Sequence, residues 1–529
     1  MKILVSDKLS MQGMDLLKQQ SEWQVDVKTG LSPEQLLQEI GQYDALLVRS
    51  NTKVTAKVIQ AAENLKVIGR AGTGVDNINL EAATNRGIVV MNTPGGNSIS
   101  VAELAVGLIL AMARQVPQAG SSTKAGKWDK KSFSGFELRD KTLGIVGFGR
   151  IGMEVARRAR AFQMNLLVYD PYVSDRLAKD SNVQLVSLEQ LLGNSDIITL
   201  HVPSLESTRN MINAQSIDRM KKGVYLINTA RGELINETDL LAGLESGKIA
   251  GAALDVLAVE PPTPGHSLVS HPRVIVTPHI AASTTEAQEV VGVEIAQQVR
   301  DFLKDGIIRN AVNFPSVSFD EYKKIGPFLQ LGENLGSFLS QICEGRMNEV
   351  GIRYYGEVFE TNTQLIASSI VLGILKPILG DNVNLINARK ILDDRGIVLV
   401  ESRSNRVRSY FNLISLRLKT DVREEWVEGT ILSKDNIRLV SVDGIDIEAP
   451  LLGTMLLIRN NDTPGVIGQV GTLLGNNQIN IANFALGRGE NYHAVGVVNV
   501  DSPIHEALLN QIRACSSIQF ARVVQLNER

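Results

Sequence analysis

The segment Leu143–Gly152 places the pattern Gly-x-Gly-x-x-Gly between an apolar, strand-like run and a helical run. Gly147 permits a tight turn, Gly149 lets the backbone approach a pyrophosphate, and Gly152 lets the helix pack closely on the strand. The free N–H groups and the positive dipole end of the helix then face the anion. On its own the pattern also fits a simple packing turn, so the neighbouring sequence must distinguish a nucleotide-binding turn from a packing turn.

The next strand-like run, Leu166–Tyr169, ends at Asp170, about 20 residues after the glycines, where dinucleotide-binding folds place an acid beside the adenosine ribose. A carboxylate there accepts hydrogen bonds from the ribose diol and repels a 2′-phosphate. Pro171 follows and no arginine stands beside it, so NAD is expected as the cofactor in preference to NADP. The alternative is an acidic helix cap or an exposed loop residue. Arg150 and Ile151, in the first helical turn, are expected to line the same site.

Short β-branched runs alternate with helical patterns from the N-terminus to about residue 310, which predicts βαβ units around parallel sheets. Because the glycine pattern begins too late for a domain that starts at residue 1, another domain precedes it. Helical runs at 98–110 and 284–304 are long enough to cross between two lobes. The expected domains are a discontinuous, flavodoxin-like substrate-binding domain, residues 1–98 and 287–312, and a Rossmann-like NAD-binding domain, residues 99–286.

After residue 312 the pattern changes to strand-like alternation with two helical stretches, which is typical of an α+β module. This middle domain is expected to span residues 313–451. The last part, residues 452–529, has the order strand, helix, strand, strand, helix, strand, and this βαββαβ order is typical of a ferredoxin-like fold. The chain is therefore expected to be an α/β protein of four domains.

The composition indicates which partners and which cellular compartment to expect. Of the 529 residues, 44% are hydrophobic and 21% charged, and the net charge of -3 offers no broad basic surface for nucleic acid. The two cysteines, Cys343 and Cys515, stand far apart without metal-ligand spacing, so no metal site is expected and a reducing compartment fits best. The longest apolar run, near 370–379, falls short of the roughly 20 residues that span a bilayer, and no signal-peptide pattern opens the chain. A cytoplasmic protein without membrane contact is expected.

Three polar segments beyond the glycine pattern each follow a strand-like run, where open α/β sheets place their ligands. They carry Arg231, Glu260 and His279. Hydride transfer from an alcohol needs a base for the hydroxyl proton and a cation for a substrate carboxylate, and these residues supply candidates for both. Taken singly, a loop arginine, a glutamate before proline and a histidine after proline are more often solvated, turn-forming or capping residues.

Together, and in this order behind the glycine pattern, these motifs resemble the D-2-hydroxyacid dehydrogenase family. The resemblance implies an NAD-dependent oxidoreductase in which His279 is the general acid/base, Glu260 pairs with it and raises its pKa, and Arg231 binds the substrate carboxylate. His201, at the end of another strand, is the nearest rival to His279. The residues implied to line the cofactor are Thr73, Val202, Thr229, Ala230, Arg231, Asp255 and His279.

The segments Val48–Asn51 and Gly69–Asn77 resemble the substrate loops of the phosphoglycerate dehydrogenases within that family. The resemblance implies that Arg49 meets a substrate phosphate, with Ser50 beside it, and that N–H groups of the glycine-rich loop around Gly72 cradle the carboxylate. The implied substrate is 3-phosphoglycerate, oxidised with NAD to 3-phosphooxypyruvate as the first step of L-serine biosynthesis. Glyoxylate and hydroxypyruvate reductases share much of this pattern, and an NAD-sensing, corepressor-like binding protein would reuse the fold.

Near the C-terminus, Arg459–Gly468 and Asn477–Ile481 resemble an ACT domain, an amino-acid-sensing module. The resemblance implies that Asn460, Asp462 and Asn480 contact an effector, L-serine, across a dimer interface; a purely structural role in dimerisation is the alternative. The middle domain resembles the intervening domain of the longest phosphoglycerate dehydrogenases. Members of this family are usually homo-oligomers, often tetramers, so a homotetramer is expected.

Overall fold

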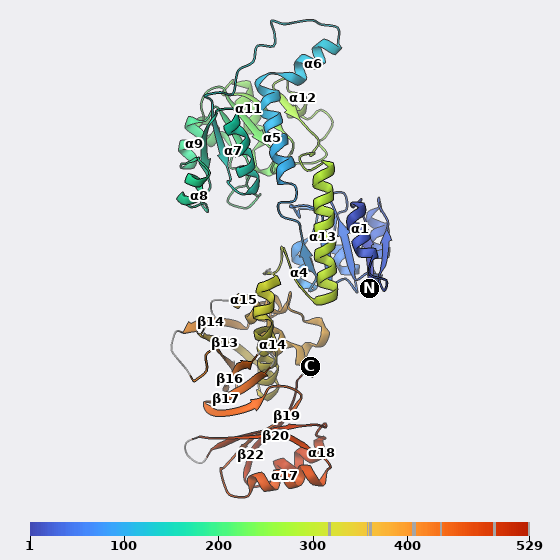
Figure 1. Cartoon of the computed structure of the whole chain (residues 1–529), viewed down its shortest axis with the longest axis vertical. Helices are drawn as coiled ribbons and strands as arrows, with labels where there is room; N and C mark the ends of the chain where they lie inside the picture. The colour runs from blue at the N-terminus through green and yellow to red at the C-terminus, as the bar shows by residue number, and fades with distance from the viewer. Residues whose placement is uncertain are drawn as a thin grey trace.

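The computed structural model describes residues 1–315, 319–356, 358, 362–404, 409–433, 436–489 and 493–526, with the backbone alone at 319 and 320. Within these residues, four β-sheets follow one another along the long axis of the molecule (Figure 1). The predicted α/β class and the order of the four fold types are confirmed. The exact domain limits stay a prediction.

The first sheet has five parallel strands in the order β2-β1-β3-β4-β5, which is the flavodoxin-like order. Its central strands are buried on both faces, as in other parallel sheets covered by helices. The strands are β1 (Lys2–Val5), β2 (Gln24–Val27), β3 (Ala45–Val48), β4 (Val67–Arg70) and β5 (Val89–Met91). The helices are α1 (Met11–Lys18), α2 (Pro33–Glu39), α3 (Ala56–Ala61) and α4 (Leu80–Asn85).

The second sheet has seven parallel strands in the order β12-β11-β10-β9-β6-β7-β8. The strand order reverses between β6 and β9, and such a switch point is where Rossmann-like folds bind dinucleotides. The strands are β6 (Thr142–Val146), β7 (Asn165–Tyr169), β8 (Gln184–Leu185), β9 (Ile197–Leu200), β10 (Val224–Asn228), β11 (Ile249–Leu254) and β12 (Val274–Val276). The helices are α6 (Val116–Lys124), α7 (Arg150–Ala161), α8 (Asp175–Asp180), α9 (Leu188–Asn194), α10 (Ala214–Arg219), α11 (Glu237–Glu245) and α12 (Ser267–Ser270).

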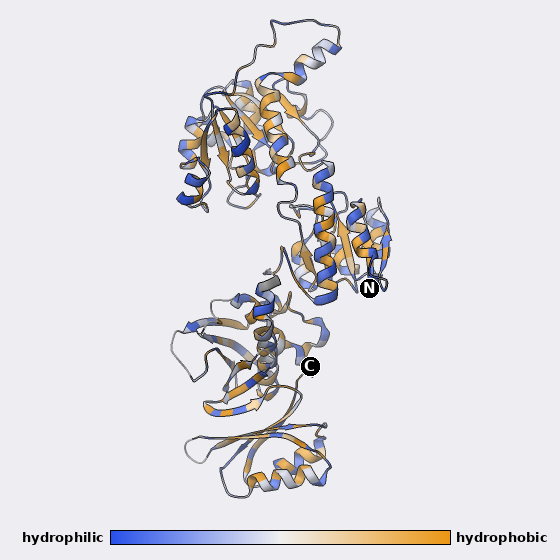
Figure 2. Ribbon diagram, viewed as in Figure 1, coloured by the Kyte–Doolittle hydropathy of each residue, from blue (hydrophilic) through white to orange (hydrophobic). Residues whose placement is uncertain are grey.

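Two long helices connect the lobes that these sheets form. α5 (Ser98–Ala113) packs on α7 and on β10 and β11, and α13 (Thr285–Asp305) packs on α1 and β4. α5 is apolar along most of its length, whereas polar and apolar residues alternate along α13 (Figure 2). The two helices meet where they begin, because the Ser100 and Thr284 hydroxyls are hydrogen-bonded at 2.7 Å. This junction brings the cleft-facing loops of both lobes together.

The intervening domain has a mixed six-stranded sheet in the order β14-β13-β15-β16-β17-β18. Only the β13–β14 pair is parallel among the pairs described in this sheet. The strands are β13 (Met347–Tyr355), β14 (Val398–Ser404), β15 (Leu413–Thr420), β16 (Glu424–Ser433), β17 (Asn436–Val442) and β18 (Ile445–Pro450). The helices are α14 (Phe319–Ile342), α15 (Thr363–Leu379) and α16 (Ala388–Asp394). α14 and α15 pack along each other in the core.

The segment Thr363–Asn382, which contains α15, has the length and hydropathy of a membrane span, and α5 with α6 passes the same test as a bent pair. The segment is longer than the apolar run near 370–379 noted in the sequence, because it also includes the residues from Thr363 to Ser369. In the structure 67% of the most apolar window of Thr363–Asn382 is buried. A helix buried in a protein core is as apolar as a membrane span, so it passes the same test of length and hydropathy.

The ACT sheet is antiparallel, in the order β20-β21-β19-β22, and the predicted βαββαβ order is confirmed. Its helices cover one face, while the other face packs on the intervening domain, so that every residue of β21 is buried. The strands are β19 (Thr454–Asn460), β20 (Ile481–Arg488), β21 (Ala494–Val500) and β22 (Ile518–Gln525). The helices are α17 (Val466–Asn476) and α18 (Glu506–Arg513).

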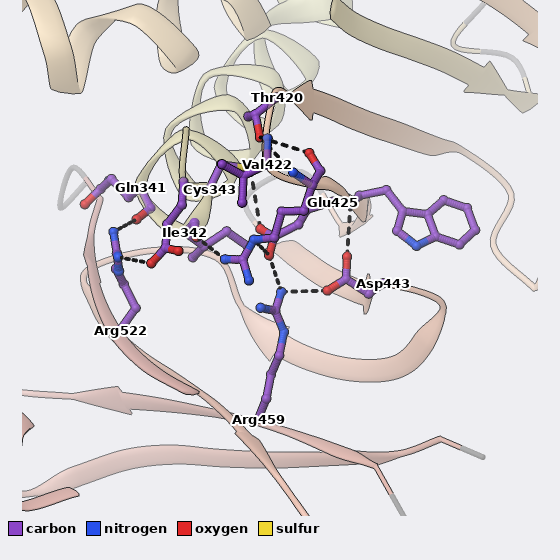
Figure 3. Close-up of polar contacts among 12 residues, drawn as sticks. Gln341, Ile342, Cys343, Thr420, Val422, Glu425, Asp443, Arg459 and Arg522 are labelled. Atoms are coloured by element: carbon purple, nitrogen blue, oxygen red, sulfur yellow. Dashed lines mark hydrogen bonds and ion pairs between the residues drawn. The ribbon is translucent and has the colours of Figure 1, made fainter. Parts of the chain in front are cut away.

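A cluster of charged side chains lies at the junction of the ACT sheet and the intervening domain (Figure 3). The Glu425 side chain is only 3% exposed and pairs at 2.8 Å with both Arg423 and Arg459. Arg459, which comes from β19 of the ACT sheet, also pairs with Asp443 at 2.6 Å. Its guanidinium lies 4.8 Å from the centre of the Phe520 ring. Cations from both domains thus neutralise one buried acid.

Candidate active site

The glycine loop lies between β6 and α7, at the switch point of the second sheet. Gly147 has a φ of 92°, and a Cβ atom there would lie 2.6 Å from the His201 carbonyl oxygen. A Cβ at Gly152 would lie 2.2 Å from the Gly147 carbonyl oxygen, so α7 packs directly on the turn. A Cβ at Gly149 would meet open space, which leaves room for a pyrophosphate at the N-terminus of α7. Ile151 is half-buried in the first turn of this helix.

Asp170 follows β7 and lies against the glycine loop. Its Oδ2 accepts the Phe148 N–H at 2.8 Å, and its Oδ1 accepts the Tyr172 N–H at 2.9 Å. These bonds hold the carboxylate at the edge of the crevice where the ribose is expected. Arg150 donates to the Pro94 carbonyl oxygen, in the connection that leads into α5. Its guanidinium therefore bridges the two lobes in this structure.

Two buried polar atoms beside the crevice, His201 Nδ1 and Thr229 Oγ1, have no hydrogen-bond partner among the described residues. The two residues follow neighbouring strands, because Leu200 pairs with Asn228 at the ends of β9 and β10. Val202 follows and contacts the turn at the glycine loop. Because buried polar atoms without partners are costly, these two atoms fit a polar ligand such as NAD.

His201 is a poor candidate for a proton acceptor. Burial lowers the pKa of His201 to about 4, so the ring is neutral near neutral pH and is a weak base. Its Nε2 lies 2.9 Å from the Thr199 hydroxyl, and no carboxylate is bonded to the ring. The geometry therefore favours His279 over this rival.

Arg231 lies where the two lobes meet. Asn228 holds its loop, since Nδ2 donates to the Arg231 carbonyl oxygen at 2.8 Å and Oδ1 accepts the Ala230 N–H at 3.0 Å. The Arg231 Nε donates to Asp76 Oδ2 at 3.0 Å, across from the first sheet. A Cβ at Gly74 would lie 1.9 Å from Arg231 Nη2, so the glycine admits the arginine. The guanidinium is paired with a carboxylate of the protein itself.

Glu260 and His279 form a hydrogen-bonded acid–imidazole pair. His279 Nδ1 lies 2.7 Å from Glu260 Oε2, and Glu260 Oε1 accepts the Leu257 N–H at 3.0 Å. The hydrogen bond to Glu260 raises the pKa of His279 above its ordinary value, more than burial lowers it. Burial raises the pKa of Glu260, but the bonds from His279 and Leu257 outweigh burial and leave it below its ordinary value. Half of the His279 side chain is exposed, so the ring can meet a ligand.

The loop that carries His279 is fastened to Asp255. Asp255 is 1% exposed, and its Oδ1 accepts the Thr277 hydroxyl at 2.6 Å and the Ile280 N–H at 2.9 Å. Its Oδ2 accepts the Ala281 N–H at 2.9 Å. His279 has a φ of 53°, a left-handed conformation that few residues other than glycine adopt. The carboxylate that was expected to line the cofactor thus also fixes the backbone of the histidine loop.

A cleft of about 890 Å³ lies between the lobes, with His279 on one wall and Lys8, Arg49 and Arg70 on the other. Burial and the charges of Arg231 and Arg49 lower the pKa of Arg70 to about 10. The Arg70 Nε is buried and has no hydrogen-bond partner in the described part of the chain. This wall therefore carries positive charge that an anionic ligand would stabilise.

Sequence reasoning missed Arg70, although it stands at the end of β4, where parallel sheets gather their ligands. It also missed Asp7, which is 4% exposed and accepts the Arg49 N–H at 2.6 Å. This bond fixes the backbone from which Arg49 and Ser50 reach the cleft. Position at a strand end was the available signal for both residues.

Gly72 does not offer its N–H to a substrate carboxylate, although the sequence had suggested that it would. Its N–H donates to Thr93 Oγ1 at 2.7 Å, so this group is not available to a substrate carboxylate. Its φ is 140°, and a Cβ there would lie 1.6 Å from Arg70 Nη1, so the glycine makes room for the guanidinium. The N–H groups of Thr73 and Gly74 donate to no acceptor among the described residues. A carboxylate would use these two groups instead.

The three expected effector residues do not meet within one chain. Asn460 ends β19, and its Oδ1 accepts the Asp462 N–H at 2.9 Å. Asp462 also pairs with Arg488 at 3.2 Å. Asn480 precedes β20 at the opposite end of the sheet and donates to Asp501 at 2.6 Å. Six strand residues, or about 20 Å, separate the two ends.

Comparison with known proteins agrees with this arrangement. Residues 106–281 match the model for the D-isomer specific 2-hydroxyacid dehydrogenase, NAD binding domain. Residues 324–443 match the D-3-phosphoglycerate dehydrogenase intervening domain, and residues 454–516 match the ACT domain. The chain is therefore an NAD-binding oxidoreductase of the D-2-hydroxyacid type.

Relatives and solved structures narrow the family further. A glyoxylate reductase structure from Paecilomyes thermophila has a TM-score of 0.54 and 32% identity over 59% of this chain and 97% of that one. The D-3-phosphoglycerate dehydrogenase of Synechocystis is 42% identical over 99% of this chain and 95% of the relative. That of Archaeoglobus fulgidus is 42% identical over 99% of this chain and 100% of the relative. The chain belongs to the D-3-phosphoglycerate dehydrogenase family.

Proposed function

We propose that the chain oxidises 3-phospho-D-glycerate to 3-phosphooxypyruvate with NAD, the first step of L-serine biosynthesis. The observation that carries this proposal is the cationic wall of Arg49 and Arg70 opposite the Glu260–His279 pair. A lactate-like acid needs a clamp for one carboxylate only, whereas this wall offers charge for a second anionic group. The name shared by the full-length relatives supports the same substrate.

In this reaction each residue has a defined task, and NAD, when bound, accepts the hydride. His279 takes the hydroxyl proton at Nε2, because Nδ1 faces Glu260. Glu260 stabilises the imidazolium that results. Arg231 exchanges Asp76 for the substrate carboxylate, which the free N–H groups of the loop after β4 also bind. Arg49 and Arg70 hold the phosphate.

The cofactor residues follow from the same geometry. Gly147 and Gly149 admit the pyrophosphate to the N-terminus of α7, and Asp170 receives the ribose hydroxyls. Thr229 Oγ1 and His201 Nδ1, which have no hydrogen-bond partner among the described residues, would supply further polar contacts.

The decisive test is NADH formation with 3-phosphoglycerate by the purified protein, together with the variant His279→Ala. We expect the variant to lose turnover while it still binds NADH, because the ring takes the proton and the glycine loop holds the cofactor. NADH binding is read by fluorescence titration. Turnover by His279→Ala at the wild-type rate would contradict the acid/base role.

A second candidate is reduction of glyoxylate or hydroxypyruvate, which the likeness to the glyoxylate reductase structure favours. A panel of 3-phosphoglycerate, glycerate, hydroxypyruvate and glyoxylate separates the two, since only the first carries a phosphate for Arg49 and Arg70. Turnover of any of them would exclude a corepressor-like protein that only senses NAD.

We further propose that L-serine is the effector and that the protein is a cytoplasmic homotetramer. Because Asn460 and Asp462 lie at one end of the ACT sheet and Asn480 at the other, a ligand that contacts all three needs two chains. Val116 at the start of α6 is 56% exposed and Trp128 beyond it is 80% exposed, so this arm offers two apolar side chains to a second copy. Sedimentation analysis, with and without L-serine, tests the assembly.

A further inference from the structure

The turn 257–260, which carries Glu260, is fastened from its outer side by a second acid–imidazole pair. Glu237, the first residue of α11, accepts the Ala258 N–H through Oε1 at 2.9 Å. Its Oε2 lies 3.1 Å from His266 Nε2. Glu260 itself accepts the neighbouring Leu257 N–H. Two successive N–H groups of one turn therefore donate to two different glutamates.

The outer pair is less exposed than the pair that faces the cleft. The side chains of Glu237 and His266 are 24% and 19% exposed, against 34% for Glu260 and 50% for His279. Neither Glu237 nor His266 lines the cleft between the lobes. The outer pair is therefore suited to hold the turn and not to touch substrate.

The same turn also touches the segment of Arg231. A Cβ at Gly232 would lie 2.0 Å from the Leu257 carbonyl carbon and 2.4 Å from the Ala258 nitrogen, so the two backbones are in direct contact. A shift of the turn would change the position of Glu260 and press on the arginine loop. Loss of the outer contact would thus affect two residues of the expected catalytic set, Glu260 and Arg231.

We infer that Glu237, braced by His266, is a positioning residue that holds Glu260 against His279. This inference rests on the proposed function only in the identity of the substrate. The groups that set the pKa of His279 are Glu260, Asp255 and Arg231, and Glu237 acts through the first of these. When the Ala258 N–H loses its acceptor, the turn relaxes and the bond between Glu260 and His279 loosens.

The experiment compares the wild type with Glu237→Ala, Glu237→Gln and, as a matched control, Glu245→Gln on the exposed face of the same helix. Oxidation needs a neutral His279, so the acid limb of the pH profile of kcat/KM reports the pKa of that ring. For Glu237→Ala we expect kcat to fall by about tenfold or more, because small misplacements of positioned groups are costly. We also expect the acid limb to move to lower pH, with NADH affinity unchanged. Glu237→Gln keeps an acceptor for the Ala258 N–H and should restore most of the activity.

A second measurement makes the result independent of the substrate. The chain has six histidines, so isotope labelling of histidine gives a small set of ring signals, and the signal lost in His279→Ala identifies His279. Its titration midpoint should be lower in Glu237→Ala than in the wild type and unchanged in Glu245→Gln. An unmoved midpoint overturns the inference, even if kcat and the melting temperature fall. A further outcome is that the wild type fails to turn over 3-phosphoglycerate while the His279 midpoint still differs between the wild type and Glu237→Ala. That result would refute the proposed substrate and leave the positioning role of Glu237 intact.

Discussion

The protonation state at which His279 works depends on one hydrogen bond, to Glu260. Replacing Glu260 with Gln keeps the shape of the side chain and removes its charge, so the pKa of His279 falls toward its ordinary value of about 6.5. Because the oxidation needs the neutral ring, we expect the acid limb of kcat/KM to move to lower pH. The value of kcat should fall as well, since the imidazolium then loses its hydrogen-bonded carboxylate and keeps only the more distant charge of Asp255. Rate measurements across the pH range test both effects, and an unshifted limb would contradict them.

Arg70 is also a single residue on which the site depends, because its guanidinium is largely buried in the cleft wall and its Nε has no hydrogen-bond partner among the described residues. Replacing Arg70 with Met should raise KM for 3-phosphoglycerate by roughly 10- to 100-fold, the value of one charge-assisted hydrogen bond. The KM for NAD should stay as in the wild type. Lys53→Met, at an exposed cation of the same lobe, is the control. If Arg70→Met and Lys53→Met raised KM equally, Arg70 would contribute only to the overall positive charge of the lobe and would not contact the phosphate.

The sequence predicted the residues that a motif contains but not the partners that tertiary structure adds. Arg231, Glu260 and His279 stand in recognisable segments after strands, and the structure brings Glu260 and His279 into direct contact. The partner of Arg231 is Asp76, 155 residues away, and no local pattern joins them. Gly72 was expected to offer its N–H to substrate, yet only the folded loop shows that Thr93 already accepts it.

At the scale of elements, the turn between β6 and α7 depends on the absence of one side chain. A methyl group at Gly152 would lie 2.2 Å from the Gly147 carbonyl oxygen, so Gly152→Ala must push the helix away from the turn. We expect NADH affinity to fall by at least about tenfold, because the helix N-terminus no longer faces the pyrophosphate. Gly193→Ala, where the nearest atom is 3.7 Å away, is the matched control. Fluorescence titration with NADH measures the affinity of both variants. Equal affinities would contradict the proposed contact between the turn and the N-terminus of α7.

Most helices and strands could be predicted because their patterns are local. The expected runs 98–110 and 284–304 correspond to α5 and α13, and the six elements of the ACT domain appear in the expected order. The burial of a side chain against another element depends on tertiary contacts and could not be predicted from local patterns. Ser369 of α15, for example, is buried against α14, where its hydroxyl donates to the Leu329 carbonyl oxygen.

At the scale of the whole molecule, the separation of Asn460 from Asn480 predicts a shared effector site. Neither Asn460→Ala nor Asn480→Ala should respond to L-serine when tested alone. Chains of the two variants, unfolded and reassembled together, should regain part of the response, because one interface then combines two intact halves. Inhibition curves of the single and mixed preparations give the answer. Mixed assemblies as insensitive as their parents would place the site within one chain.

The charged cluster around Glu425 has a consequence for how the C-terminal half comes apart. Separating the ACT sheet from the intervening domain would leave an anion without its Arg459 partner and would wet the apolar underside of β19 and β21 at the same moment. Because both losses occur together, we expect the two C-terminal domains to melt as a single cooperative block, with neither left as a folded intermediate.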